Sequence, residues 1–345
     1  METPDRTPDA PHRTSYRRIL LSLIGLLACL LLLWFVWGVL LPAWKDPAAF
    51  FTARRSVRWE ARIDSTWQEG PLVQQSLRIS GFLEEDPPAE HRPPVAFDAY
   101  YSRPAGTEDP VVAMVVLGGI RTGRDAIRII GDRPSVGRVG AFLTMDYPYS
   151  GPRSFRGIEM LPWVPRVREA LFDGVEAVRL ALDFLEAQPE VDPARMVLLG
   201  GSLGAFYVVD AGALDSRPAA IVSFMGGGDL TALLESNLRA GGHVPTRLLS
   251  VPLAAYLGLL VRPLEPTRLA HRMSPTPYLQ VSATDDERIP RENARLLFEA
   301  ASEPKRIHWM EGEHVLPHRD EIIEEMVRIA LDELRRLGLI QTSLG

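Results

Sequence analysis

A short apolar run that ends in a glycine-rich turn around a serine most restricts the fold of this chain. Residues 196–199 (Met-Val-Leu-Leu) are all apolar, as is typical of a strand covered on both faces of a parallel sheet. The turn at 200–204 (Gly-Gly-Ser-Leu-Gly) has the spacing G-x-S-x-G, and small and apolar residues follow it to Ala213. Glycines allow a sharp strand-to-helix turn without a Cβ clash, and such a turn exposes the serine hydroxyl. Ser202 is therefore a candidate nucleophile, although a plain chain reversal also favours small residues.

Strand-like and helical patterns alternate along the chain from residue 111 onward. This alternation predicts an α/β fold, with a mostly parallel central sheet and helices on both faces. Alternating polar and apolar runs between 56 and 103 predict leading antiparallel strands. A helical pattern interrupted by prolines at 230–274 predicts a cap-like insertion that covers a site. The other expected strands lie in 111–119, 140–148, 219–228, 277–290 and 305–317, and the expected helices cover 164–191 and 319–338.

An uncharged apolar run covers residues 19–41. As a helix it spans roughly 34 Å, enough to cross a hydrocarbon core of about 30 Å. Arginines precede the run and tryptophans gather toward its far end, so we expect a single-pass signal anchor whose N-terminus is cytoplasmic. The run is too long for the apolar region of a cleaved signal peptide, while the lipobox-like residues ending at Cys29 leave lipidation open.

The chain accordingly divides into four expected parts. Residues 1–18 predict a disordered cytoplasmic tail, 19–41 the transmembrane anchor, 42–55 a linker, and 56–340 one folded domain. With this orientation the domain is extracytoplasmic, and periplasmic if the membrane is a bacterial inner membrane. The sequence leaves the oligomeric state open.

The composition argues against several classes of partner. A net charge of −6 provides no general basic surface for nucleic acid. The single cysteine, Cys29, excludes an intrachain disulfide and a cysteine-ligated zinc site. Of the seven histidines only His314 and His318 stand four residues apart, and the one cysteine lies far from them in the sequence. We therefore expect no metal, no cofactor and no nucleic-acid partner.

Two polar segments follow expected strands downstream of Ser202. An acidic pair, Asp285 and Asp286, follows one strand, and His314 follows the next. The order serine, acid, histidine at strand ends resembles the α/β-hydrolase superfamily over about residues 95–338, in its dienelactone-hydrolase and prolyl-oligopeptidase-like branch.

The segment "DDERIP" is similar to the acid loop of that branch, where the acid usually falls four residues before the proline. That position is Asp286. Asp285 remains the alternative acid, because Ala283 stands where the loop usually has glycine.

The resemblance implies a role for each of these residues. His314 would take the proton of Ser202, and Asp286 would hold the imidazole in the required tautomer. The backbone N–H of Leu203 would supply one oxyanion donor, and the "LGGIRTG" loop the other at Gly119, with Ile120 as the alternative. His318 competes with His314, but it opens the last helix.

These residues indicate a membrane-anchored serine hydrolase that acts on a small-molecule ester or acyl substrate through an acyl-enzyme. A peptidase or amidase of the same fold is the first alternative. A non-catalytic scaffold of the same fold is the second, because a fold does not determine a function.

Overall fold

The computed structural model describes residues 12–84, 95–106, 109–120, 122–126, 139–152, 159, 162–241, 247–316 and 318–341. The chain forms two compact units, Met1–Lys45 and Asp46–Gly345. The first unit is helical and the second contains the sheet.

The first unit consists of α1 (His12–Phe35), a π-helical turn η1 (Val36–Leu40) and α2 (Leu41–Trp44). Its segment Ile19–Leu40 has a mean hydropathy of 2.9 and is long and apolar enough to cross a membrane. The helix begins at His12, inside the tail predicted to be disordered, while residues 1–11 of that tail lie outside the described residues. Once an apolar helix has nucleated, adjoining arginines extend it readily because they have a high helix propensity.

The predicted linker at 42–55 is wrong for its second half, which belongs to the folded domain. Helix α3 (Pro47–Thr52) follows Asp46, whose carboxylate accepts a hydrogen bond from the backbone N–H of Ala49 at 3.1 Å. Phe51 is buried, and Arg55 pairs with Asp183 of α5 at 2.7 Å. Burial of an aromatic ring and pairing of the arginine fix a segment whose local composition resembles a linker.

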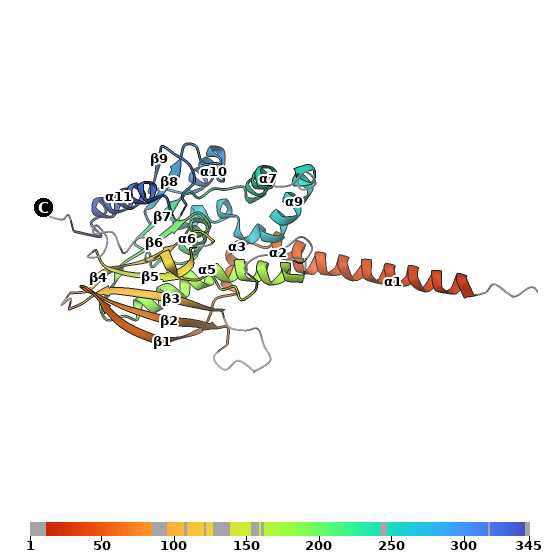
Figure 1. The fold of residues 1–345 in the computed structure, drawn as a ribbon, viewed down its shortest axis with the longest axis horizontal. Helices are drawn as coiled ribbons and strands as arrows, with labels where there is room; N and C mark the ends of the chain where they lie inside the picture. The colour runs from red at the N-terminus through yellow and green to blue at the C-terminus, as the bar shows by residue number, and fades with distance from the viewer. Residues whose placement is uncertain are drawn as a thin grey trace, which may run out of the picture. The chain divides into compact units, whose positions relative to one another are not determined.

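The described strands form one sheet in the order β1-β2-β3-β5-β4-β6-β7-β8-β9. Strands β1 to β3 and the β3–β5 pair are antiparallel, and the pairs from β5 onward are parallel. Figure 1 shows this progression from β1 at the bottom to β9 at the top. The predicted α/β fold with leading antiparallel strands is confirmed. The strands are β1 (Arg58–Glu69), β2 (Leu72–Phe82), β3 (Val95–Pro104), β4 (Val111–Leu117), β5 (Ala141–Met145), β6 (Val191–Gly201), β7 (Ala220–Phe224), β8 (Tyr278–Ala283) and β9 (Lys305–Met310).

Alternate residues of the central strands feed two cores on opposite faces of the sheet. In β4, Val115 joins the core under α5 (Val164–Glu186) and α6 (Leu203–Leu214), whereas Met114 and Val116 join the core under α11 (Asp320–Arg336). Side chains of a strand alternate between faces, so an apolar run must be covered twice. The short element η2 (Gly123–Asp125) follows β4, and residues 127–138 lie outside the described residues.

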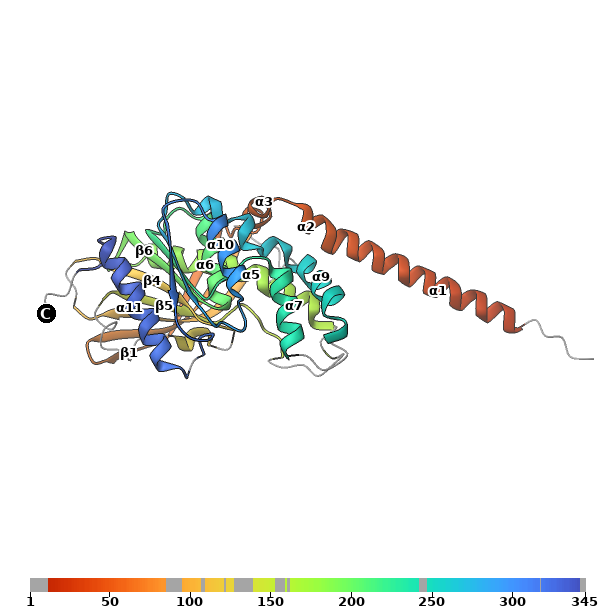
Figure 2. The same cartoon turned by 90° about the horizontal axis from the view of Figure 1, so that it is seen from above.

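The described part of the insertion at 230–274 is helical, as its pattern predicts, and two of its helices lie far from α11 (Figures 1 and 2). Figures 1 and 2 place its helices α7 and α9 at the opposite end of the domain from α11. The helices α7 and α9 pack against each other, and α10 (Arg291–Ala300) follows β8. The insertion comprises α7 (Leu230–Gly241), α9 (Ser250–Val261), η4 (Arg262–Leu264), η5 (Pro266–Arg268) and η6 (Ala270–Met273).

Candidate active site

Ser202 occupies a sharp turn between β6 and α6. Its backbone has φ 54° and ψ −117°, which residues with a side chain rarely adopt, and its N–H donates to the Phe224 carbonyl at 2.9 Å. The flanking glycines are required by close approaches. A Cβ at Gly200 would collide with the backbone of Gly204, and a Cβ at Gly204 would lie 2.6 Å from the Cβ of Leu117. The G-x-S-x-G spacing thus allows the strained turn that holds the serine at the end of β6.

His314 lies between Ser202 and Asp286. Its Nε2 is 2.9 Å from Ser202 Oγ, and its Nδ1 is 2.8 Å and 2.9 Å from the two carboxylate oxygens of Asp286. Both His314 and Asp286 are buried. A carboxylate facing Nδ1 favours the tautomer with the proton on that nitrogen, so Nε2 can accept the proton of the serine hydroxyl.

The acid loop distinguishes Asp286 from Asp285. Asp286 Oδ1 accepts hydrogen bonds from the backbone N–H groups of Arg288 at 2.9 Å and Ile289 at 2.8 Å. Asp285 is exposed, and its carboxylate accepts a hydrogen bond from the Thr284 hydroxyl at 2.9 Å. The structure therefore brings Asp286 to His314 and leaves Asp285 in solvent.

Glu287, the residue after Asp286, connects the acid loop to the backbone of His314. Its carboxylate accepts a hydrogen bond from the backbone N–H of His314 at 3.1 Å. Burial alone would raise the pKa of Glu287, but backbone hydrogen bonds from its own N–H and from His314 lower it, as does attraction to His314 and Arg288. Glu287 is thus held as an anion that fixes the loop carrying the histidine.

The two residues expected to provide the oxyanion donors lie beside Ser202. Leu203 is the first residue of α6, where backbone N–H groups have no partner within the helix. A Cβ built on Gly119 would lie 3.9 Å from Ser202 Oγ, so the loop after β4 approaches the hydroxyl closely. Ile120, the alternative to Gly119, exposes 73% of its surface.

Tyr147 is a site residue that the sequence analysis missed. Its hydroxyl donates to the carbonyl oxygen of Gly118, next to Gly119. Burial, followed by the neighbouring Tyr207, raises the pKa of Tyr147 well above its ordinary value, so the phenol keeps its proton. Its place just after β5 was the available signal, because the ends of neighbouring parallel strands converge.

The other candidates lie outside this arrangement. His318, the competitor of His314, is exposed just before α11 and lies outside the hydrogen-bonded chain of Ser202, His314 and Asp286, although it lines the cavity at Ser202. Among the residues that the structure describes, no group of three or more His, Cys, Asp or Glu side chains is arranged to hold a metal ion.

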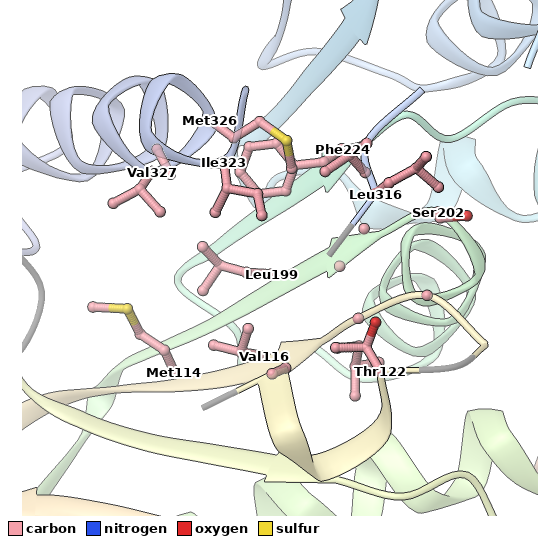
Figure 3. Close-up of a pocket in the computed structure, with 18 of the residues that line it drawn as sticks. Met114, Val116, Thr122, Leu199, Ser202, Phe224, Leu316, Ile323, Met326 and Val327 are labelled. Atoms are coloured by element: carbon pink, nitrogen blue, oxygen red, sulfur yellow. The ribbon is translucent and has the colours of Figure 1, made fainter. Parts of the chain in front are cut away.

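A cavity of about 650 Å³ opens at Ser202. Figure 3 shows it running from Ser202 past Leu199 toward Met114 and Val327, between the sheet and α11. The predicted cap does not enclose it: within the described part of 230–274, no residue lines this cavity.

No family model matches the sequence. The chain is 27% identical over 209 residues to the polyketide transferase ATR5 of Stachybotrys chlorohalonatus (strain IBT 40285), covering 47% of this chain and 70% of that protein. Acetyl xylan esterase 1 from Thermoanaerobacterium sp. JW/SL YS485 is similar in structure, with a TM-score of 0.58 and 16% identity over 83% of this chain and 94% of the esterase. A glucuronoyl esterase from Solibacter usitatus gives a TM-score of 0.52 and 16% identity over 82% of this chain and 90% of that chain.

The two structural similarities extend over most of the chain at low identity. The chain has the α/β-hydrolase fold, as the order of its motifs predicts. Its resemblance to the dienelactone-hydrolase and prolyl-oligopeptidase-like branch stays a prediction.

Proposed function

We propose that this chain is a membrane-anchored serine hydrolase that cleaves carboxylic esters through an acyl-enzyme. The observation that carries the proposal is the continuous hydrogen-bonded chain from Ser202 Oγ through His314 to Asp286. A serine hydroxyl is a weak nucleophile until a neighbouring base accepts its proton, and this geometry supplies that base.

The first half-reaction forms the acyl-enzyme. Ser202 Oγ attacks the ester carbonyl carbon while His314 Nε2 takes the hydroxyl proton. The negative carbonyl oxygen faces the N–H groups of Leu203 and Gly119, and Asp286 stabilises the imidazolium. The bond from the carbonyl carbon to the alkoxy oxygen then breaks, and His314 gives its proton to the departing alcohol.

The second half-reaction releases the acid. Water gives a proton to His314 and attacks the acyl carbon, the bond to Ser202 Oγ breaks, and His314 returns a proton to the serine. The enzyme is regenerated without a metal or cofactor.

The similar proteins support ester chemistry. The similar structures include an acetyl xylan esterase and a glucuronoyl esterase, and the relative in sequence is a polyketide transferase. An esterase and an acyl transferase share the acyl-enzyme and differ in whether water or an alcohol accepts the acyl group.

Two observations support the anchor and its orientation. Residues 19–34 are exposed, as those of a lipid-facing helix would be. Arg54 and Arg55, whose charges oppose the positive-inside bias, form ion pairs with Glu169, Glu176 and Asp183 inside the domain. Protease added to spheroplasts should therefore digest the domain, whereas protection of the domain would show that the orientation is the opposite one.

The two alternatives are testable against the same site. A peptidase or amidase would cleave a peptide library at least as well as esters. A scaffold would need no activated serine, and the 2.9 Å distance between Ser202 Oγ and His314 Nε2 gives no support to that alternative.

The decisive experiment is covalent labelling of the full chain in phospholipid nanodiscs with a fluorophosphonate probe. We expect the wild type to be labelled, and Ser202→Ala and His314→Ala to be unlabelled. His308→Ala is the matched control for the histidine and should label like the wild type, because His308 is exposed and does not line the cavity at Ser202. A folded wild type that never labels would overturn the proposal in favour of the scaffold.

A further inference from the structure

The cavity at Ser202 has a polar end and an apolar body. The residues with polar or charged side chains that line it, including Thr122, Arg288 and His314, come from the loops around Ser202. Away from these loops, the described lining residues of β4, β5, β6, β7 and α11 are apolar. Figure 3 shows Met114, Val116 and Leu199 rising from the strands toward Ile323 and Val327 of α11.

Two walls give similar lengths for the apolar body. Along β4 and the residue after it, the lining residues extend from Met114 to Gly118, which is roughly 13 Å at a strand rise of about 3.3 Å per residue. Along α11 they extend from Ile323 to Leu334, which is roughly 16 Å at about 1.5 Å per residue. An acetyl group would occupy only the end of such a space next to Ser202.

The apolar lining of the cavity determines which chemical groups can bind in it. A sugar or a charged group placed there would lose hydrogen bonds to water, and the apolar walls offer no replacement. A hydrocarbon gains from the same burial, and cavities of this volume with apolar walls and a few polar groups at one end are typical ligand sites.

Building on the proposed function, we propose that this pocket binds the acyl group of the substrate, and that the enzyme acts on esters of long or bulky apolar acids. The ester carbonyl lies at Ser202, and the hydrocarbon part extends between the sheet and α11. Val327 lines the pocket far from Ser202 (Figure 3), and Ala330 lines it about one turn farther along α11, so these two residues then determine how long an acyl chain is accepted.

The test compares p-nitrophenyl acetate, butyrate, octanoate and dodecanoate as substrates of the full chain in nanodiscs. We expect kcat/KM of the wild type to rise at least about tenfold from acetate to octanoate, since each buried methylene contributes up to about fourfold. In Ala330→Phe the ring fills the remote end, so the dodecanoate-to-butyrate ratio of kcat/KM should fall at least about tenfold.

The matched control is Arg328→Phe on the same helix. Arg328 is exposed and does not line the pocket, so its substitution should leave that ratio within about twofold of the wild type. Both variants meet the same lipid, so partitioning of the esters into the nanodisc cancels in the comparison. If Ala330→Phe does not fold, Val327→Phe replaces it, because Val327 is only half-buried and accommodates a larger ring.

The outcomes separate the two proposals. If esters are hydrolysed but acetate is preferred, or if both pocket variants keep the wild-type ratio, the acyl assignment is wrong and the hydrolase proposal stands. If no ester is hydrolysed and Ser202 is not labelled by the fluorophosphonate, both are wrong.

Discussion

Helix α11 and the helices α7 and α9 of the insertion at 230–274 lie at opposite ends of the folded domain, and they relate to Ser202 in different ways (Figures 1 and 2). Helix α11 lines the cavity that opens at the serine, and the loops before it carry His314. Within its described part, the insertion lines none of this cavity. Its connection to the site is indirect: the side-chain amide of Asn237 donates to the carbonyl oxygen of Arg288 in the acid loop at 3.0 Å.

This difference shows that the position of an insertion in the sequence does not decide what it covers. A helical segment between β7 and β8 was expected to cap the site, yet the last helix of the chain provides the wall. Substitutions on the two sides should therefore change different quantities.

The largest effect is expected beside α11, in the acid loop. Asp286→Asn keeps the shape of the side chain but removes the charge that stabilises the imidazolium and its tautomer. We expect kcat for p-nitrophenyl octanoate to fall by about 10⁴-fold, the size found for comparable triads. Asp285→Asn is the matched control and should stay within about twofold of the wild type, since Asp285 faces solvent. Equal losses in the two variants would contradict the assignment of the acid.

A smaller effect is expected where the insertion meets the same loop. Asn237→Ala removes the hydrogen bond to the Arg288 carbonyl, an exposed contact of about 0.5–1.5 kcal/mol. We expect kcat to fall between about twofold and tenfold, with the same factor for every acyl length, whereas Ser236→Ala should have no effect. A selective loss of long-chain esters in Asn237→Ala would show that the insertion shapes the pocket after all.

The smallest effect concerns stability on the insertion side. Asp210 of α6 is fully buried, and its carboxylate has no hydrogen-bond partner among the described residues. Burial, followed by the negative charge of Glu265 in the insertion, raises the pKa of Asp210 well above its ordinary value. The folded state therefore retains this proton at a pH where the unfolded state has lost it, so stability decreases as the pH rises above about 4.

Asp210→Asn cannot ionise and removes this dependence. Relative to the wild type, its free energy of unfolding should increase from pH 5 to pH 8 by on the order of 1 kcal/mol, measured by urea denaturation of both proteins. Asp215 is the control, because its contribution to stability should change with pH in the opposite direction. Burial would raise the pKa of Asp215, but its hydrogen bonds and ion pair with Arg217 lower it overall, so this carboxylate stabilises the fold as the pH rises. A wild-type trend unchanged by Asp210→Asn would rule out this source of pH dependence.

The sequence alone determined the fold class and the order of the chemical groups. Strands that are apolar on both faces must be covered on both faces, and a sharp turn around Ser202 requires the glycines beside it. Both features can therefore be predicted from short stretches of sequence. Short stretches of sequence could not decide which of the two aspartates lies nearer to His314. Asp285 and Asp286 are chemically identical neighbours. The loop folds back so that the backbone N–H groups of Arg288 and Ile289 donate to Asp286, and this places the Asp286 carboxylate against His314.

Only the tertiary structure decided where the cavity lies and what belongs to the domain. Residues 46–55 look like a linker until Phe51 and Arg55 meet α5, and Tyr147 reaches Gly118 only because neighbouring strand ends converge. The sequence pattern at 319–338 predicted a helix, but such a pattern does not reveal whether the helix packs on a filled core or borders an open pocket. That depends on distances between segments more than 100 residues apart, which no local pattern encodes.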